Sequence, residues 1–389
     1  MLFIKKFISV VGIAAVLLIL LTGCSGNGTS DIPSFSFSSK SDPVSVSEPK
    51  TSHGTSSADD TSEPFPETGE TSDASKASAP SVGEPRTLVL SHDPINEKTV
   101  EIDGNRMTIT GRTADSPIDY ISAFPDCVSV ELRLNSNGFT AVIELTDPSS
   151  DGVNLAFGYE DGNSNDIDFV INENGFAPCD LSDIVEANKS AVENALEQPL
   201  NQVAEYIAEG GNAKEVREVM DEIQRLSDEI CGGLSSDYDK LRAISRWVSA
   251  NIYYDYPAYD AGVPAETLSL KYLLDNHSSV CGGYSNMTSA LCAAQGIKCW
   301  NVHGSVLLGG QSFASDNDGG VYHEWNFAEI DGRIIWLDAG WDSFCKLQRN
   351  GEYDNGGIGY RYFDIGEEYF ADNHKANYAE YRDYFALLQ

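Results

Sequence analysis

The dipeptide Asp331-Gly332 constrains the fold of this chain more than any other feature, because it stands between two apolar-rich runs, YHEWNFAEI and RIIWLDAGW. Asp-Gly in such a position is a strong signal for a β-hairpin that is closed by a two-residue type I′ turn. In that hairpin Ile330 pairs with Arg333, and the pairing of every other residue follows from this first pair. The dipeptide therefore predicts two antiparallel strands and also their register.

The predicted register places His323 and Asp338 on one face of the hairpin. Asp338 pairs with Trp325 in this register. His323 pairs with Gly340, which makes it a diagonal neighbour of Asp338, close enough for an imidazole ring to meet a carboxylate. A loop one residue longer would turn one of the two side chains to the other face.

A helix that starts at Cys281 is predicted by the run SSVCGGYSNMTSALCAAQG. Apolar residues recur at helical spacing at Tyr284, Met287, Leu291 and Ala294. Gly296 stands where a helix commonly stops. At a helix N-terminus, unpaired backbone N–H groups and the positive end of the helix dipole favour a thiolate over a thiol. Gly282 and Gly283 carry no side chains that could block a substrate carbonyl approaching Cys281.

A cysteine at a helix start, a histidine on one strand and an aspartate on the next can supply the nucleophile, base and orienting acid of a catalytic triad. Three motifs surround these residues: CGGY at 281–284, HEWN at 323–326, and DGRIIWLDAGWD ending at Asp342. Together they resemble the transglutaminase-like superfamily, and most closely its bacterial and kyphoscoliosis-peptidase-like branch. The resemblance extends over about 236–375, a little over a third of the chain.

The resemblance implies a fold and a role for each of three residues. Cys281 would be the nucleophile, His323 the base and Asp338 the residue that orients the base. The fold would be a papain-like α+β core, in which a helix carrying the cysteine packs on an antiparallel sheet carrying the other two residues.

Two other histidines compete with His323 for the role of base. His303 ends a strand-like run without a comparably placed acid, and His277 lies only four residues before the nucleophile. Glu324 and Asn326 alternate onto the opposite face of their strand, so neither should orient His323.

The chemistry implied is acyl transfer through a thioester, and it requires no metal and no cofactor. The backbone N–H of Cys281 would help to hold the oxyanion, and Tyr254 and Tyr284 are candidates for a second donor. Hydrolysis of an amide bond in a protein or peptide is favoured, because the site of an exported protein faces water. The alternatives are a protein-glutamine transamidase that crosslinks proteins, and a non-enzymatic surface-binding lipoprotein that uses the same fold as a scaffold.

The N-terminus resembles that of a bacterial lipoprotein. Residues 1–23 read as a signal peptide, and the run Leu21-Thr22-Gly23-Cys24 looks like a lipobox, which implies lipidation of Cys24. Residues 24–86 are dominated by Ser, Thr, Pro and acidic residues and are predicted to form a disordered tether. The mature protein would thus be anchored on the extracytoplasmic face of a cell membrane.

The rest of the chain divides into three predicted parts. Residues 87–178 have roughly seven short strands separated by turn signals, which indicates a β-sandwich-like module. Residues 179–235 form a helical connector interrupted at Pro199 and at Gly210-Gly211. Residues 236–389 form the catalytic domain, and Ser236 is a plausible cap for its first helix.

The net charge of −35 restricts the possible partners. An acidic surface repels nucleic acid and anionic polymers, whereas cationic peptides or amines are favoured at encounter. A protein or peptide substrate, including a cell-wall or surface protein, is therefore expected. Apart from Cys24 and Cys281 the chain has six cysteines, whose pairing the sequence leaves open, as it does the oligomeric state.

Overall fold

A computed structural model of the protein describes residues 85–199, 201, 203–208, 212–308, 313, 320–359 and 361–388. The predicted signal peptide, Cys24 and all but the last two residues of the predicted tether lie outside these residues. Residues 81–389 form one compact unit. Among the residues that the structure describes, no helix has the length and apolar character needed to cross a membrane.

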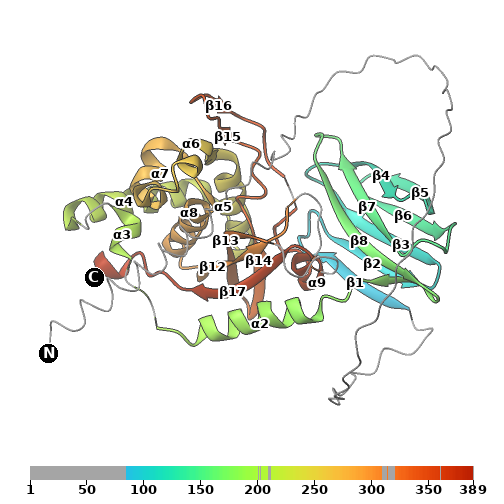
Figure 1. Cartoon of the computed structure of the whole chain (residues 1–389). Coiled ribbons are helices and arrows are strands. Elements are labelled where there is room, and N and C mark those ends of the chain that lie inside the picture. The colour runs from blue at the N-terminus through green and yellow to red at the C-terminus, as the bar shows by residue number, and fades with distance from the viewer. Residues whose placement is uncertain are drawn as a thin grey trace, which may run out of the picture. The chain divides into compact units, whose positions relative to one another are not determined.

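Nine strands lie between Arg86 and Pro178, where the sequence predicts about seven (Figure 1). They are β1 (Arg86–Ser91), β2 (Lys98–Asp103), β3 (Arg106–Arg112), β4 (Ile118–Phe124), β5 (Val128–Asn135), β6 (Gly138–Leu145), β7 (Gly152–Tyr159), β8 (Ser164–Asn172) and β9 (Gly175–Pro178). They form two antiparallel sheets in the orders β1-β2-β3-β6-β5 and β4-β7-β8-β9. The prediction of a β-rich region ahead of the core is confirmed.

The helices follow, and one ends at Leu196, ahead of the interruption predicted at Pro199, whereas Gly210-Gly211 lie outside the described residues. They are α2 (Ser182–Leu196), α3 (Ala204–Ile207), α4 (Ala213–Ile230), α5 (Asp237–Asn251), α6 (Tyr256–Asp260), α7 (Leu270–Asn276), α8 (Cys281–Ala294) and α9 (Glu367–Ala371), with short 3₁₀ turns at Ala265–Leu268 and Ala386–Leu388. Ser236 caps α5, because its hydroxyl accepts the N–H of Asp239 at 3.0 Å. Gly296, with φ of 73°, follows the end of α8 as predicted.

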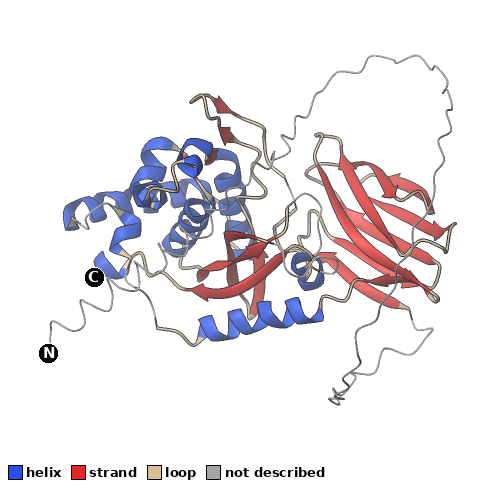
Figure 2. Ribbon diagram, viewed as in Figure 1, coloured by secondary structure: helices blue, strands red, loops and turns tan. Residues whose placement is uncertain are grey.

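The central sheet has the order β14-β13-β12-β17, and all its neighbouring strands are antiparallel (Figure 2). Its strands are β12 (Cys299–Val306), β13 (Val321–Ile330), β14 (Arg333–Leu337) and β17 (His374–Glu380). Ile330 pairs with Arg333, so the predicted register is confirmed. Asp331 and Gly332 have φ of 53° and 75°, the positive values that a type I′ turn requires.

A second, smaller sheet joins short strands in the order β11-β10-β15-β16. They are β10 (Tyr253–Asp255), β11 (Ser278–Ser279), β15 (Lys346–Leu347) and β16 (Tyr353–Asp354). Tyr254 pairs in parallel with Ser279, two residues before Cys281. This pairing brings the segment after α5 beside the start of α8.

The two faces of the central sheet bury their apolar side chains in different hydrophobic clusters. On one face Trp325 and Phe327 join the buried residues of the N-terminal sheets. On the other face Ala328 packs with Met287 and Leu291 of α8. The prediction of a cysteine-bearing helix on an antiparallel sheet is therefore confirmed, and the period-2 alternation of β13 decides which cluster each side chain enters.

The N-terminal sheets also meet the core through polar contacts. The guanidinium of Arg361 donates to Asp166 at 2.9 Å, and Asp93 accepts from Arg242 at 3.2 Å. A backbone bridge joins Ser91 to Ile365. These contacts and the shared hydrophobic cluster make residues 81–389 one continuous structure.

Candidate active site

Cys281 is the first residue of α8 and is partly exposed. Val280, which precedes it, offers no side chain to cap the helix. The N–H groups of Gly283 and Tyr284 donate to the carbonyl of Val280. The first N–H groups of a helix have no partner inside it, so those of Cys281 and Gly282 are placed to receive a negative charge.

Gly282 and Gly283 allow close packing around the start of α8. A Cβ at Gly283 would collide with the side chain of Ser279, and one at Gly282 would lie 3.2 Å from the Glu324 carboxylate. Both glycines are buried. They allow the segment before α8 and the strand β13 to approach the helix closely, and their expected role in leaving room for a substrate carbonyl stays a prediction.

His323 and Asp338 meet as the hairpin register predicts. The Nε2 atom of His323 lies 2.6 Å from Oδ2 of Asp338. Cys281 interacts with the same imidazole and contributes to its raised pKa. The structure thus joins His323 to Asp338 and has Cys281, the nucleophile expected from the sequence, beside the imidazole.

The charges of this group stabilise one another. Burial alone would lower the pKa of His323, but Asp338 and the hydrogen bonds to Asp338 and Cys281 raise it to about 10. Burial alone would raise the pKa of Asp338, but the imidazole groups beside it hold that pKa below its usual range. Near neutral pH the pair is therefore an imidazolium and a carboxylate.

A second histidine, for which the sequence predicts no role in the site, contacts the same carboxylate. Nε2 of His374 lies 3.1 Å from Oδ2 of Asp338, the atom that also receives His323. The remaining oxygen, Oδ1, accepts the backbone N–H of Trp341 at 2.9 Å. Because His374 stands on β17, whose pairing with β12 is long-range, no local pattern points to it.

Aromatic rings enclose the two histidines. Trp341 lies 5.6 Å from the ring of His323 and 4.6 Å from that of His374, measured between centroids. Trp325 is 1% exposed and packs edge-on to His374. Both tryptophans therefore pack around the two histidines and keep water from the carboxylate of Asp338.

Within the described residues, His323, Asp338 and His374 are the group whose ligand atoms converge enough to be considered for a metal, all lying within 4.8 Å of one another. The 2.6 Å between His323 Nε2 and Asp338 Oδ2 is a hydrogen-bond length. Ligands that each lie about 2.1 Å from one ion are held farther apart than this. The geometry therefore fits shared protons better than a metal ion.

The competing residues are occupied elsewhere. His303 contacts the hydroxyl of Tyr322 at 2.7 Å, and His277 is an exposed residue at the end of α7. The Tyr284 hydroxyl donates to the carbonyl of Ile252 at 2.5 Å and is buried, so it cannot serve as an oxyanion donor.

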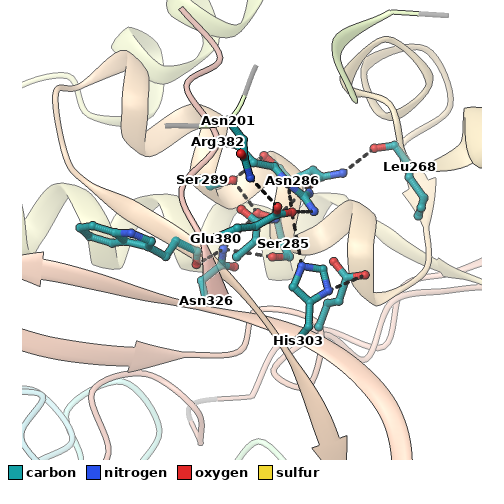
Figure 3. A network of polar contacts seen from close by, with 12 residues as sticks. Asn201, Leu268, Ser285, Asn286, Ser289, His303, Asn326, Glu380 and Arg382 are labelled. Carbon is teal, nitrogen blue, oxygen red and sulfur yellow. Dashed lines mark hydrogen bonds and ion pairs between the residues drawn. The ribbon is translucent and has the colours of Figure 1, made fainter. Parts of the chain in front are cut away.

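A polar network fixes α8 against the edge of the sheet (Figure 3). Asn286 of α8 lies at its centre, and its Oδ1 accepts from Arg382 and, at 3.0 Å, from Asn301. Arg382 in turn donates to Glu380 of β17 at 2.8 Å. These contacts hold α8 against β12 and the end of β17, and Cys281 is the first residue of the helix held in this way.

A family model of the transglutaminase-like superfamily matches residues 224–342. No curated protein matches the chain significantly. Among solved structures, one described as a TGase is 14% identical with a TM-score of 0.28, and the match covers 61% of this chain and 50% of that one. The chain thus spans about half the length of that structure.

Two further structures are similarly remote. One from Cytophaga hutchinsonii, provisionally called a cysteine protease, is 14% identical with a TM-score of 0.25, covering 78% of this chain and 84% of its own. Another from Parabacteroides distasonis, provisionally called a protease, is 9% identical with a TM-score of 0.22, covering 71% and 48%. At TM-scores this low, none of the three structures supports a conclusion about this chain.

The family match, in contrast, contains Cys281, His323 and Asp338. This segment therefore has a transglutaminase-like core, an α+β arrangement with a cysteine-bearing helix on an antiparallel sheet.

Proposed function

We propose that this protein is a cysteine acyl-transfer enzyme that hydrolyses an amide bond of a protein or peptide. One observation carries the proposal: His323 hydrogen-bonds to the Asp338 carboxylate at 2.6 Å and also interacts with Cys281, the first residue of a helix. A transglutaminase-like core supports a cysteine-type enzyme in general. The finer assignment rests on this geometry.

The reaction would proceed in two steps. Sγ of Cys281 attacks the amide carbonyl, and the C–N bond breaks while His323 gives its Nδ1 proton to the leaving amine. A thioester on Cys281 remains. His323 then takes a proton from water while the oxygen of that water attacks the thioester. The carboxylic acid is released, and the thiol of Cys281 is regenerated. Asp338 stays ionised throughout and keeps the imidazole oriented.

Two donors would hold the oxyanion that forms in each step. The first is the backbone N–H of Cys281 at the start of α8. The second is the hydroxyl of Tyr254, whose strand lies beside the segment leading to Cys281. Burial, followed by the nearby Cys281, raises the pKa of the Tyr254 phenol, so it stays protonated and able to donate.

The proposal is tested with residues 81–389 as a soluble form and with Cys281→Ser as its matched control. Both are incubated with a peptide library, and products and adducts are identified by mass spectrometry. We expect cleaved amides and an acyl adduct on Cys281 that hydroxylamine removes, with neither in the control. If the folded protein gives neither cleaved amides nor an acyl adduct with any peptide of the library, the non-enzymatic scaffold is favoured instead.

Transamidation is the second candidate, and the position of Glu324 favours it. Its carboxylate lies beside Gly282, next to the nucleophile, and its side chain is 11% exposed. Within the described ranges it forms no ion pair with Lys or Arg; its contacts are the Tyr322 hydroxyl at 2.8 Å and His303 at 3.5 Å. A carboxylate in this setting could hold the ammonium group of an amine. Incorporation of a fluorescent alkylamine into a glutamine-containing peptide would identify this reaction.

We also propose export and lipid anchoring at Cys24, on the extracytoplasmic face of a cell membrane, with a peptide or surface protein as substrate. The support is the sequence of residues 1–24, with its two lysines, apolar run and lipobox-like end. Metabolic labelling with a palmitate analogue should mark the full chain and should not mark Cys24→Ser. Equal labelling of both would contradict the anchor.

A further inference from the structure

His374 is the buried ionisable group closest to the proposed triad that the reaction itself does not use. It is 0% exposed and begins β17. Asn188 of α2 holds the backbone around it, donating to the His374 carbonyl at 3.0 Å and accepting the N–H of Ala376 at 2.7 Å. Figure 1 shows α2 running beside β17. The ring stacks on Phe370, with 4.3 Å between centroids.

The proton positions on this ring follow from its partners. A carboxylate only accepts hydrogen bonds, so the nitrogen that faces Asp338, Nε2 at 3.1 Å, must carry a hydrogen. The other nitrogen, Nδ1, lies 2.6 Å from Oδ1 of Asn373, whose NH₂ group donates to the Tyr362 hydroxyl at 3.1 Å. The oxygen and the NH₂ of an Asn amide can exchange places, and with the amide turned over Asn373 donates to an unprotonated Nδ1 and accepts from Tyr362.

Burial and two neighbouring cations, His323 on β13 and Arg361 before α9, favour the neutral form of the ring, whereas the carboxylate of Asp338 after β14 favours the charged form. The titratable Tyr362 is also in contact. Burial lowers the pKa of His374 to about 4, although the hydrogen bond to Asp338 opposes this effect. His374 can therefore donate to the carboxylate without bringing a second cation beside His323.

We propose that His374 is a positioning residue of the triad, whose Nε2 hydrogen pins the same oxygen of Asp338 that accepts the hydrogen of His323. The inference rests on the proposed function. Trp341 holds the other oxygen through its backbone N–H, so the carboxylate has a donor on each side and cannot rotate away from His323. With His374 removed, Asp338 loses a donor that stabilises its charge, and the imidazolium of His323 loses its fixed partner.

Two substitutions separate this role from packing. His374→Phe keeps an aromatic ring against Phe370 and removes the hydrogen-bond donor. His374→Gln places an amide NH₂ near the position of Nε2 and restores it. The rate of Cys281 alkylation by iodoacetamide is measured at pH 6.5 and at pH 9.5, in residues 81–389 of the wild type and of both variants.

At pH 6.5 a reactive thiolate depends on the imidazolium, whereas at pH 9.5 a cysteine ionises largely without help. One hydrogen bond to a charged group corresponds to roughly a tenfold effect or more. We therefore expect His374→Phe to label at least tenfold more slowly than the wild type at pH 6.5 and within about threefold of it at pH 9.5. His374→Gln should recover most of the difference. A packing defect alone would change both rates, and Gln would not rescue it.

Equal labelling of wild type and His374→Phe at both pH values would overturn the inference. Slow labelling of the wild type itself at pH 6.5 would instead contradict the proposed function, so the two failures are distinguishable. If His374→Phe does not fold, ¹⁵N NMR of the wild-type imidazole groups tests the role proposed for His374 instead. A neutral His374 ring protonated at Nε2 from pH 5 to pH 8 is expected, and protonation at Nδ1 or titration near pH 6.5 would overturn it.

Discussion

Asp338 is the residue on which the proposed active site converges. Its two oxygens accept from His323, His374 and the backbone of Trp341, and it is 1% exposed. A buried carboxylate with this many donors remains ionised and holds one orientation. The local sequence predicts the contact with His323, because a two-residue turn determines the register, but it gives no sign of the contact with His374.

Replacement of Asp338 by Asn should abolish most turnover while preserving the shape of the site. The amide is neutral and can present its NH₂ to His323, so the imidazolium form of His323 is no longer favoured. We expect turnover to fall by about 10³-fold or more, as for other triads that lose the orienting charge. The measurement is the rate of amide cleavage at pH 7, with the unfolding midpoint as a control for folding.

The stabilisation from the His323–Asp338 pair should depend on pH in a defined direction. The pKa of His323 is raised to about 10 in the folded protein, so its contribution is complete below the unfolded value of about 6.5 and disappears as pH rises through 10. The pKa of Asp338 is lowered, so its contribution is present above about pH 4 and disappears as pH falls.

Urea unfolding of wild type and His323→Gln checks this dependence. The difference in unfolding free energy between them should be largest between about pH 4.5 and 6.5 and should shrink steadily towards pH 10. A difference that stays constant over this range would show that the pair is not charged in the folded state.

Removal of the Tyr254 hydroxyl should affect catalysis and leave the nucleophile reactive. Tyr254→Phe is expected to lower turnover by about 10- to 100-fold, because one oxyanion donor is lost. Alkylation of Cys281 at neutral pH should change little. Tyr259→Phe is the matched control, since this nearby ring is 47% exposed. Equal turnover in both variants would exclude Tyr254 as a donor.

At the scale of elements, the sequence predicts what short-range interactions determine. The Asp331-Gly332 turn predicts the pairing of β13 with β14, and Cys281 and Gly296 mark the limits of α8. The pairing of β17 with β12 joins residues far apart in the chain, and nothing local encodes it. His374 could not be assigned for this reason, because its partner is determined by that pairing.

Apolar residues alternate along β5 at Val128, Val130, Leu132 and Leu134, and they are not equally buried. Val128 is 7% exposed but Leu134 is 60% exposed. β5 lies at the edge of its sheet. Alternation in the sequence shows which side chains share a face, but it does not show how much of that face is covered.

Substitution of Gly304 in β12 tests how closely the central sheet is packed. It pairs with His323 on one side and with Ala376 of β17 on the other. A Cβ there would collide with the ring of Trp325 and the carbonyl of Lys375. We expect Gly304→Ala to destabilise the fold by about 1–3 kcal/mol in denaturant unfolding. Gly232→Ala, whose Cβ would have only contacts of 3.4 Å or longer, is the control and should change stability little.

At the scale of the whole molecule, the N-terminal sheets and the core share one hydrophobic cluster. Trp325 and Trp300 of the central sheet belong to the same cluster as Val100 and Phe157 of the N-terminal sheets. Composition and turn signals predict the strands of these sheets. They cannot reveal that the sheets pack against the core, because that contact depends on which faces remain uncovered after each part has folded.

Residues 81–389 should therefore unfold in a single cooperative transition. Separation of the N-terminal sheets from the core would expose apolar surface and break the pair between Arg361 and Asp166. Differential scanning calorimetry should show one peak whose calorimetric and van't Hoff enthalpies agree. Two resolved peaks would show that the two parts fold independently.

The pH dependence of Cys281 alkylation by iodoacetamide tests the central claim most directly. Residues 81–389 and their His323→Ala variant are compared from pH 5 to pH 10, with the modified residue identified by mass spectrometry. The account predicts fast labelling of the wild type at pH 6 to 7, and a variant that labels slowly there and speeds up only as the pH approaches the usual thiol value of about 8.5. Slow labelling of the wild type with the same pH profile as the variant would contradict a thiolate–imidazolium pair, and with it the proposed enzyme.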